Sequence, residues 1–600
     1  MDHLRIHLLF FCLIVVMVET TIASKASTDP VFHPCCGFPC QNRGVCTSRG
    51  FSDYECDCTD TGYYGRDCEQ ATLKQSIVNF LRPSKSTVHN LITNYKWLWD
   101  IINATPFIHS FLLKQIYLDR ASLVDRPIVY TSAHEYTTLE AAFNTSYYSR
   151  VLPPVHKNCP TPMGVVGKKD LPKVDDLIER LLRRRTFVPD ELNHSVMLAF
   201  FAQHFTHQFF KTNYTLGPGY TYGRHGVDLG NLYGSTVDTE NKLRSFENGR
   251  LKSQIINGEE YPPYLKDAPV KMRYPPNTPE DQKFAMGHEF YSLIPGLFMY
   301  ATVWLREHNR VARVMADVHP DWDEEQLFQT TKLIVVGETI NVVISDYVQT
   351  LSNYHARVLW KPEILFGTEY QYNNRISVEF NHLYHWHPMM PDQLHIGDTT
   401  YQIEETFFHP EIVIKHGVAE MAAAFTKQLS GSVTLRNHPN STLPVVSKLI
   451  KDGRELRLQP FNQYRKRFKL KPYQSFEDLT GNKEIADILE DMYGDIDAVE
   501  FYVGLLMEKH RKRTKFGQTM LEMGAGFSVT GLLSNPICSR KYWKPSTFGG
   551  EVGFNIVKSA TSLQELFCRN IQGDCPTISF TVPKKYTNEC KEENCSKTEL

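Results

Sequence analysis

The cysteines of this chain gather near its N-terminus. Seven of the fourteen lie between residues 35 and 68, so a short segment carries half of the total. Six of these follow intervals of four, five, nine, one and nine residues: Cys35, Cys40, Cys46, Cys56, Cys58 and Cys68. Such a segment cannot bury enough apolar surface to fold alone, so disulfide bonds must hold it together. Six cysteines allow fifteen pairings, and the seventh, Cys36, has Cys159 as its obvious distant partner.

The same segment is similar to an epidermal growth factor-like (EGF-like) module over residues 32–69. Besides the cysteine spacing, the last interval contains Gly62-Tyr63 and Gly65, an aromatic residue between glycines. We expect this module to be a structural or interaction element rather than a catalytic one.

The first residues have the organisation of a secretory signal peptide. Arg5 precedes an apolar run from Leu8 to Val18, and small residues follow at 23–26. Eleven apolar residues are too few to span a bilayer as a helix. We expect residues 1–24 to be removed and the chain to enter an oxidising compartment. The final Lys-Thr-Glu-Leu600 resembles the Lys-Asp-Glu-Leu retrieval signal, which favours the endoplasmic reticulum lumen.

Residues 71–118 contain regularly spaced apolar residues together with basic side chains. Apolar residues recur at helical spacing in three short sets, which are separated at Pro83 and Pro106. Trp97 and Trp99 are suitable anchors for a membrane interface. We predict amphipathic helices that lie in the plane of one leaflet. The alternative is a set of ordinary helices packed on a core.

Residues 119–580 show no linker, repeat or low-complexity stretch, which predicts one large body. The net charge of −2 excludes the basic excess of a nucleic-acid-binding protein. The triplet Arg183-Arg184-Arg185 is expected on the solvated surface. Helical periods predict a mainly helical body with helices over 194–211, 300–317, 325–354, 417–428 and 498–507.

The string Phe380-Asn-His-Leu-Tyr-His-Trp-His-Pro388 concentrates three histidines, a tyrosine and a tryptophan. Imidazole binds iron, and phenol and indole can lose an electron. If the string is helical, Tyr384 and His387 lie on one face, and Pro388 ends the turn. This predicts a metal or haem site beside an oxidisable side chain. The alternative is an aromatic core segment with a few surface histidines.

A second stretch carries Gln203 and His207, four residues apart and therefore on one helical face. A neutral imidazole can take a proton from one peroxide oxygen and return it to the leaving oxygen. The neighbouring amide can stabilise the charge that develops. The alternative is a buried polar pair without a catalytic role.

Together these stretches resemble the prostaglandin G/H synthases, or cyclooxygenases, within the animal haem peroxidases. The matching motifs are residues 202–210, 304–310, 383–388 and 548–554, and the resemblance extends over about the whole chain. It implies a mainly α fold with a haem-peroxidase-like catalytic domain. The implied parts are a signal peptide (1–24), an EGF-like domain (32–69), monotopic membrane-binding helices (71–118), the peroxidase and cyclooxygenase domain (119–580) and a polar tail (581–600).

The resemblance implies a role for each polar residue of the two stretches. His387 is the proximal ligand of a haem b iron, one per subunit, and Gln203 and His207 cleave hydroperoxide on the distal side. Tyr384 is oxidised to a radical that removes a bis-allylic hydrogen from arachidonate. Two dioxygen molecules then add to give prostaglandin G2, which the peroxidase reduces to prostaglandin H2. The remaining histidines of the string are expected to be structural: His382 and His385.

The resemblance also implies a fatty-acid channel that starts in the membrane segment. Arg120 binds the substrate carboxylate at its mouth beside Tyr354, with Arg126 as a rival for that role. Ser528 corresponds to the serine that aspirin acetylates. The other expected wall residues are apolar, and only the resemblance separates them from ordinary core: Val348, Leu351, Phe380, Leu383, Trp386, Phe516 and Leu521.

Further expectations concern covalent links and partners. The implied disulfides are Cys35–Cys46, Cys36–Cys159, Cys40–Cys56, Cys58–Cys68 and Cys568–Cys575, with Cys538 free. The expected glycosylation sites are Asn103, Asn144 and Asn440. A homodimer on one leaflet of the endoplasmic reticulum membrane is implied, with the nuclear envelope as a second address. Two other functions stay open: a plain peroxidase or a dioxygenase that releases only a hydroperoxide, and a non-enzymatic adhesion protein.

Overall fold

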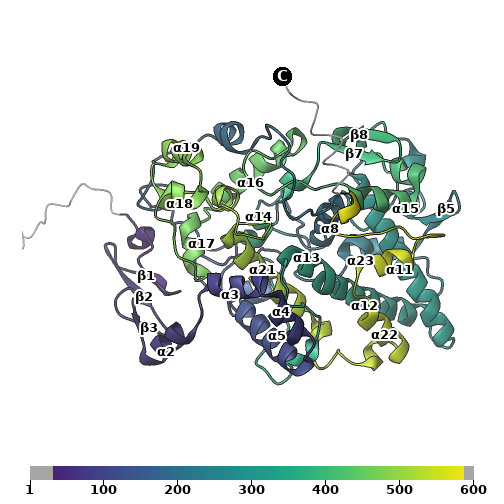
Figure 1. Cartoon of the computed structure of the whole chain (residues 1–600), viewed down its shortest axis with the longest axis horizontal. Coiled ribbons are helices and arrows are strands. Elements are labelled where there is room, and N and C mark those ends of the chain that lie inside the picture. The colour runs from purple at the N-terminus through teal and green to yellow at the C-terminus, as the bar shows by residue number, and fades with distance from the viewer. Residues whose placement is uncertain (1–31, 587–600) are drawn as a thin grey trace, which may run out of the picture.

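The computed structural model of the chain describes residues 32–586 and is mainly helical, as predicted (Figure 1). Within this range the strands form only two-stranded antiparallel sheets. The expected signal peptide and the terminal Lys-Thr-Glu-Leu lie outside the described residues, as do Cys590, Cys595 and Asn594.

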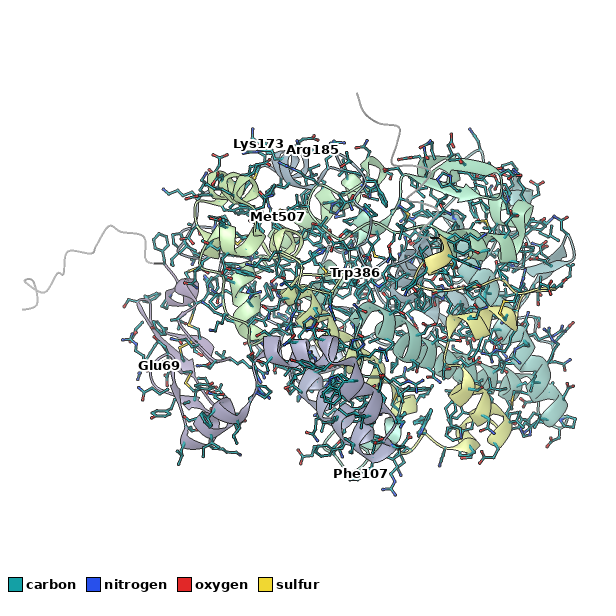
Figure 2. All side chains as sticks on the ribbon, viewed as in Figure 1. Glu69, Phe107, Lys173, Arg185, Trp386 and Met507 are labelled. Atoms are coloured by element: carbon teal, nitrogen blue, oxygen red, sulfur yellow. A yellow bond between two sulfur atoms is a disulfide. The ribbon has the colours of Figure 1, made fainter. Side chains whose placement is uncertain are left out.

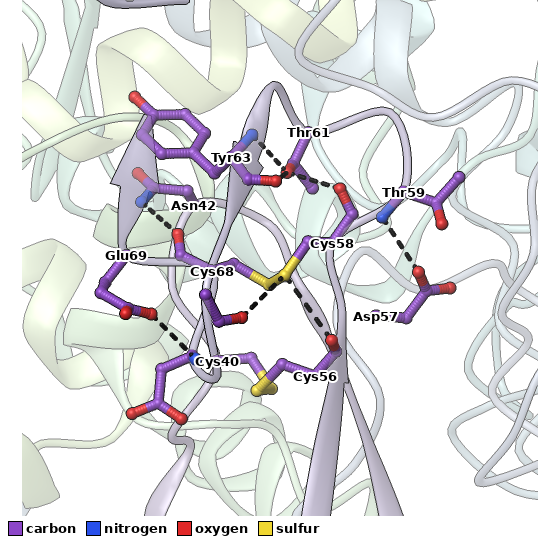
Figure 3. Close-up of a disulfide and its surroundings, with 12 residues drawn as sticks. Cys40, Asn42, Cys56, Asp57, Cys58, Thr59, Thr61, Tyr63, Cys68 and Glu69 are labelled. Atoms are coloured by element: carbon purple, nitrogen blue, oxygen red, sulfur yellow. Dashed lines mark hydrogen bonds between the residues drawn. A yellow bond between two sulfur atoms is a disulfide. The ribbon is translucent and has the colours of Figure 1, made fainter. Parts of the chain in front are cut away.

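The EGF-like module is built from two small sheets and three internal disulfide bonds. Strand β1 (Val45–Arg49) pairs with β2 (Asp53–Asp57), and β3 (Tyr63–Tyr64) pairs with β4 (Gln70–Ala71). The internal bonds are Cys35–Cys46, Cys40–Cys56 and Cys58–Cys68, the last two of which are drawn in Figure 3. Cys36–Cys159 joins the module to the body, and Cys568–Cys575 closes a loop near the C-terminus. These are the pairs that the resemblance implies, and Cys538 is free and buried.

Four helices follow the module: α2 (Leu73–Leu81), α3 (Lys85–Asn94), α4 (Lys96–Asn103) and α5 (Pro106–Ala121). Two of the three breaks between them fall at Pro83 and Pro106, as predicted, because proline stops one helix and starts another. The third break, at Tyr95, divides a stretch that was predicted as one set. They lie along the lower edge of the molecule, where Phe107 is labelled (Figures 1 and 2). Large apolar side chains are exposed on this edge: Leu73, Ile77, Phe80, Leu81, Trp97, Ile101, Phe107 and Phe111. Trp99 is not among them, since it is buried and donates from its indole nitrogen to the carbonyl of Leu91, so its predicted role as an interfacial anchor is wrong.

The body is organised around α11 (Pro295–Val318), which packs against α8 (Val196–Thr206), α12 (Glu324–Val342) and α15 (Glu411–Lys427). The helical stretch Glu324–Ser352 is long and apolar enough to cross a membrane, but 78% of its most apolar part is buried inside the protein. It is not one regular helix, since a π-helical turn (Val343–Val348) separates α12 from α13 (Gln349–Ser352). The predicted helix over 417–428 begins earlier, at Glu411, and bends at Gly417, where φ is 78°.

Two further pairs of strands are β5 (Gln254–Ile256) with β6 (Glu259–Tyr261) and β7 (Gln393–Ile396) with β8 (Thr399–Gln402). The remaining helices are α6 (Glu140–Phe143), α7 (Val174–Leu177), α9 (Gly230–Tyr233), α10 (Val237–Leu243), α14 (Val378–Leu383), α16 (Leu443–Glu455), α17 (Phe461–Arg467), α18 (Phe476–Thr480), α19 (Lys483–Tyr493), α20 (Phe501–Met507), α21 (Gln518–Leu533), α22 (Glu551–Ser559) and α23 (Leu563–Cys568). Because α21 packs against both α5 and α14, it connects α5 with the 380–388 string.

Buried histidines of the body are expected to make stability sensitive to acid. Burial lowers the pKa values of His204, His308 and His438 to about 3, against about 6.5 in an unfolded chain. At pH values between about 3 and 6.5 these histidines bind more protons in the unfolded state than in the folded state. They therefore lower the free energy of unfolding as pH falls below about 6.5. Replacing His308 by glutamine should therefore reduce the fall in unfolding temperature between pH 7 and pH 5, measured by scanning calorimetry.

The pH dependence of wild type must be compared with that of the variant, because other buried groups also contribute to it. Buried carboxyls such as Glu338 and Glu379 have raised pKa values, so their contribution to the free energy of unfolding rises as pH falls. Replacing the exposed His395 by glutamine is the control and should leave the pH dependence unchanged. An equal pH dependence in wild type and His308→Gln would contradict the assignment.

Candidate active site

The 380–388 string is not one helix. α14 ends at Leu383, Tyr384 caps it, and a separate 3-10 turn covers His387–Met389. The prediction that Tyr384 and His387 share a helical face is therefore wrong, and Pro388 begins the second turn instead of ending the first. The physical reason is that proline inside a helix removes one backbone hydrogen bond and its ring clashes with the carbonyl four residues earlier, which for Pro388 is that of Tyr384.

The three histidines of the string have different environments. Nδ1 of His382 donates to the carbonyl of Val378 at 2.8 Å, and Nδ1 of His385 donates to that of Asn381 at 2.7 Å. These bonds tie both rings to the preceding turn of α14, in agreement with a structural role. His387 differs, because neither of its ring nitrogens has a hydrogen-bond partner among residues 32–586, and Nδ1 is fully buried. His387 is therefore free to bind a ligand through nitrogen.

Gln203 and His207 lie at the C-terminal end of α8, where the backbone N–H of His207 donates to the carbonyl of Gln203 at 3.0 Å. The His207 ring stacks on His288 with centroids 4.9 Å apart, and its Nδ1 has no partner within the described range. Burial lowers the pKa of His207 to about 3, with smaller contributions from Lys211 and His385. The imidazole is therefore neutral at physiological pH and can accept a proton.

His207 and His387 are close enough to interact electrostatically. Burial lowers the pKa of His387 well below its ordinary value, and His385, His438 and His207 lower it further. Both side chains nevertheless keep some accessible surface. The two stretches that the sequence singled out therefore meet at one site.

The donor set at this site fits a haem better than a caged metal ion. Residues 32–586 contain no group of three or more His, Cys, Asp or Glu side chains that could hold a metal. A haem brings its own four nitrogens and needs a single protein ligand on one side, which the unpaired imidazole of His387 can supply. The neutral imidazole of His207 and the Gln203 amide would then face a bound peroxide.

Tyr384 is the redox-active candidate, and its surroundings hold it firmly. Its hydroxyl lies 3.1 Å from that of Tyr347, and its ring stacks on Trp386 with centroids 4.0 Å apart. Figure 2 shows Trp386 near the centre of the molecule. Burial raises the pKa of Tyr384, so the phenol keeps its proton. Sequence reasoning missed Tyr347, because nothing in the spacing of the helical pattern reveals a π-helical turn.

A largely apolar cavity extends from Arg120 at the end of α5 to Tyr384 at the end of α14. Its volume, taken as the space that the centre of a water molecule can occupy, is about 130 Å³. Nine of the predicted residues line it: Arg120, Val348, Leu351, Tyr354, Tyr384, Trp386, Phe516, Leu521 and Ser528. Phe380 and Leu383 are not part of this wall. Phe380 packs behind it, against Tyr384 and Phe527, and Leu383 approaches Gly524.

The wall also contains residues that the sequence did not single out. They are apolar side chains that look like ordinary core in sequence: Leu113, Ile116, Tyr117, Ile344, Val358, Met520, Val529, Leu532 and Leu533. Several belong to α5 and α21, whose contact forms the side of the cavity.

A cluster of charges lies at the Arg120 end of the cavity, which is called its mouth below. Arg120 lies in the last turn of α5, not after the helix as expected, and forms an ion pair with Glu522 of α21. Arg511 lies 3.3 Å from the same carboxylate. The rival Arg126 is not part of the cavity wall, since it bonds to the carbonyl of Thr530 and covers the Tyr370 ring. Glu522 was not among the predicted site residues. It is, however, the only charged residue in an apolar helix, and this pattern could have indicated a functional role.

Arg184 is a second residue that sequence reasoning misplaced. It was expected on a solvated surface, but its side chain is only 6% exposed. Its guanidinium donates to the carbonyls of Pro388 at 3.1 Å and Met390 at 2.8 Å. It therefore supports the turn that carries His387.

Comparisons with known proteins agree with this geometry. Residues 224–573 match the family described as animal haem peroxidase. The chain is 52% identical to prostaglandin G/H synthase 2 of Oryctolagus cuniculus over 92% of this chain and 91% of that protein. It is 50% identical to prostaglandin G/H synthase 1 of Mus musculus over 96% of both chains.

Solved structures extend the likeness of fold beyond these relatives. The fatty acid alpha-dioxygenase of Oryza sativa superposes with a TM-score of 0.62 over 84% of this chain and 99% of that one, at 17% identity. The family match covers more than half of the chain, and the relatives share about half of its residues over nearly its full length. The chain therefore belongs to the animal haem peroxidase family and, within it, to the prostaglandin G/H synthases.

Proposed function

We propose that this protein is a prostaglandin-endoperoxide synthase that converts arachidonate to prostaglandin G2 and then to prostaglandin H2. The observation that carries the proposal is the position of Tyr384. Its side chain lines an apolar cavity with Arg120 at the mouth, and the same string of residues carries His387. An oxidisable phenol is thus adjacent both to a space for an acyl chain and to a haem ligand.

The peroxidase half of the reaction depends on Gln203 and His207. The neutral His207 imidazole takes the proton from the inner peroxide oxygen and returns it to the leaving oxygen, which departs as the alcohol. The Gln203 amide donates a hydrogen bond to the developing charge. His387 would hold haem b, which would supply the redox chemistry for peroxide cleavage and for the oxidation of Tyr384.

The cyclooxygenase half depends on the cavity. Once Tyr384 has lost an electron and its proton, the phenoxyl oxygen can take a hydrogen atom from the bis-allylic carbon of the acyl chain and become a phenol again. Arg120 binds the substrate carboxylate, since a guanidinium offers two parallel donors to a carboxylate. The apolar walls hold the chain and exclude water, so that dioxygen is the partner of the carbon radical.

Oxygen uptake by the haem-reconstituted protein with arachidonate, followed by product analysis, tests the proposal. Formation of prostaglandin H2 is the expected result. Peroxide turnover without oxygen uptake would indicate a plain peroxidase, and uptake with only a linear hydroperoxide would indicate a simpler dioxygenase.

Replacing His387 by alanine is expected to abolish the Soret band of the reconstituted protein together with both activities. The reason is that His387 is the only histidine of the string with no hydrogen-bonded ring nitrogen in the described structure. Haem titration followed by absorbance measures the effect, and circular dichroism checks folding. Alanine at the exposed His395 serves as the control and should leave the band intact. A full band in His387→Ala would contradict the assignment.

The surroundings of the enzyme are also part of the proposal. The exposed apolar side chains of α2, α4 and α5 support insertion into one leaflet, and the channel mouth lies at the end of α5. The signal-like N-terminus and the terminal Lys-Thr-Glu-Leu support the endoplasmic reticulum lumen, with the nuclear envelope as a second address. The homodimer rests only on the resemblance to the prostaglandin G/H synthases. Flotation with neutral lipid vesicles tests the membrane claim; protein that remains soluble without detergent or vesicles would contradict it.

The expected glycosylation sites differ in accessibility. Asn440 is exposed, whereas the side-chain amides of Asn103 and Asn144 donate to the carbonyl of His355 and to Glu140. A glycan on Asn103 would replace one of the two hydrogens of an amide that already donates to His355.

A further inference from the structure

Helix α3 begins with a lysine at the mouth of the cavity. Nζ of Lys85 lies 3.3 Å from Oε2 of Glu522 on α21 and 3.3 Å from Oδ2 of Asp119 on α5. The side chain is 19% exposed, so it is directed toward the protein and not into solvent. A cation in the first turn of a helix is disfavoured by the helix dipole. The stability of α3 therefore does not explain why a lysine occupies this position.

The Glu522 carboxylate is almost completely buried and is surrounded by three cations. Its side chain is 1% exposed and contacts Arg120, Arg511 and Lys85. Burial alone would raise the pKa of Glu522, but these cations outweigh burial and lower it, so the group is charged. Arg511 also donates to the backbone carbonyl of Lys85 at 2.6 Å, which fixes the start of α3 against the mouth.

A substrate carboxylate that binds Arg120 must compete with Glu522 for the same guanidinium. A buried carboxylate that loses its cation is strongly destabilised, and two carboxylates at one mouth repel each other. Arg511 and Lys85 remain on Glu522 when Arg120 turns to the substrate. Lys85 has a compact ammonium group on a flexible stem, and it can shift toward Glu522 because Asp119 also has Arg82 at 3.0 Å.

We infer that Lys85 is a specificity-determining residue that holds Glu522 while Arg120 binds the substrate, and so favours free fatty acids over their neutral esters. This inference rests on the proposed function, in which Arg120 is the carboxylate-binding residue. Lys85 acts through Glu522 and does not touch the substrate, so it is a positioning residue.

The test compares arachidonate with its methyl ester, which has no charge. In Lys85→Met the KM for arachidonate is expected to rise roughly tenfold, while the KM for the ester and both kcat values stay within about twofold. Lys85→Arg, which keeps the positive charge, should retain the wild-type ratio of the KM values for acid and ester. The control is Lys96→Met on α4, which removes the same charge from an exposed pair with Asp100 in the same segment, and it should change neither KM.

A double-mutant cycle separates this role from a purely structural one. In a Glu522→Gln background, Lys85→Met should have no further effect on the acid-to-ester ratio, because the carboxylate on which it acts is gone. Equal losses for acid and ester, or no change in either, would overturn the inference. Equilibrium binding of acid and ester gives the same comparison without turnover, so a failure of the proposed oxygenation would remain distinguishable from a failure of the inference.

Discussion

Replacing Tyr384 by phenylalanine is expected to lower arachidonate-dependent oxygen uptake at least about a hundredfold, because the chemical step loses the group that performs it. Phenylalanine preserves the ring, its stacking on Trp386 and its edge contact with Phe380, whose centroid lies 5.3 Å away. Only the O–H group is removed, and without it no oxygen-centred radical can form at this position. Peroxidase turnover should remain within about twofold, since Gln203 and His207 belong to a different helix. An oxygen electrode and a separate peroxidase assay measure the two rates.

Tyr347→Phe is the matched control for this experiment. It removes a hydroxyl that lies 3.1 Å from that of Tyr384 and leaves the Tyr384 phenol in place. One neutral hydrogen bond contributes about 1 kcal/mol, so oxygen uptake should fall by less than about tenfold. Full oxygen uptake in Tyr384→Phe would refute the radical assignment, and a loss of the same size in both variants would assign the chemistry to the pair.

Replacing His207 by alanine is expected to reduce peroxidase turnover by about 10²–10⁴-fold, the usual contribution of a positioned general acid–base group. The imidazole is neutral because of burial, and burial also lowers the pKa of its stacked neighbour His288 well below the ordinary value. Stopped-flow measurement of hydroperoxide reduction gives the rate.

The haem band must persist in His207→Ala for this result to count, because His387 and not His207 is the proposed ligand. Added imidazole should restore part of the rate, since it can occupy the space left by the side chain. Unchanged peroxide cleavage with haem present would contradict the role of His207 as the base.

The disulfide framework and the paired functional stretches were the most predictable parts of the molecule. Cysteine spacing identifies the disulfide-rich module locally, whereas the pairing of its cysteines followed only from the resemblance to the prostaglandin G/H synthases. The residue types Gln203 and His207 also carry their information locally, because a four-residue interval already fixes a helical face. The breaks at Pro83 and Pro106 were equally local, because proline acts on its own backbone and on the residue before it.

Predictions failed where burial is decided by distant segments. Trp97 and Trp99 are two residues apart, yet one is exposed and the other is buried under α3. Arg184 was predicted on the surface, but the 388–392 segment covers it in the structure. Phe380 and Leu383 lie beside the cavity and do not line it, a distinction that no periodicity contains. The role of Glu522 could not be predicted either, because it depends on the contact between α5 and α21 that brings Arg120 to this carboxylate.

The π-helical turn at Val343–Val348 has a consequence for the evolution of this channel. A π turn holds one more residue than an α turn, so everything after it is rotated by about 100° relative to a continuous α-helix. Tyr347 and Val348 lie within this turn and Leu351 just beyond it, and these residues reach Tyr384 or the cavity. A relative that lost one residue here would keep a long buried helix and a stable core. It would, however, turn the hydrogen-bond partner of Tyr384 and part of the acyl-chain wall to another side, so a single deletion could separate peroxide chemistry from fatty-acid oxygenation.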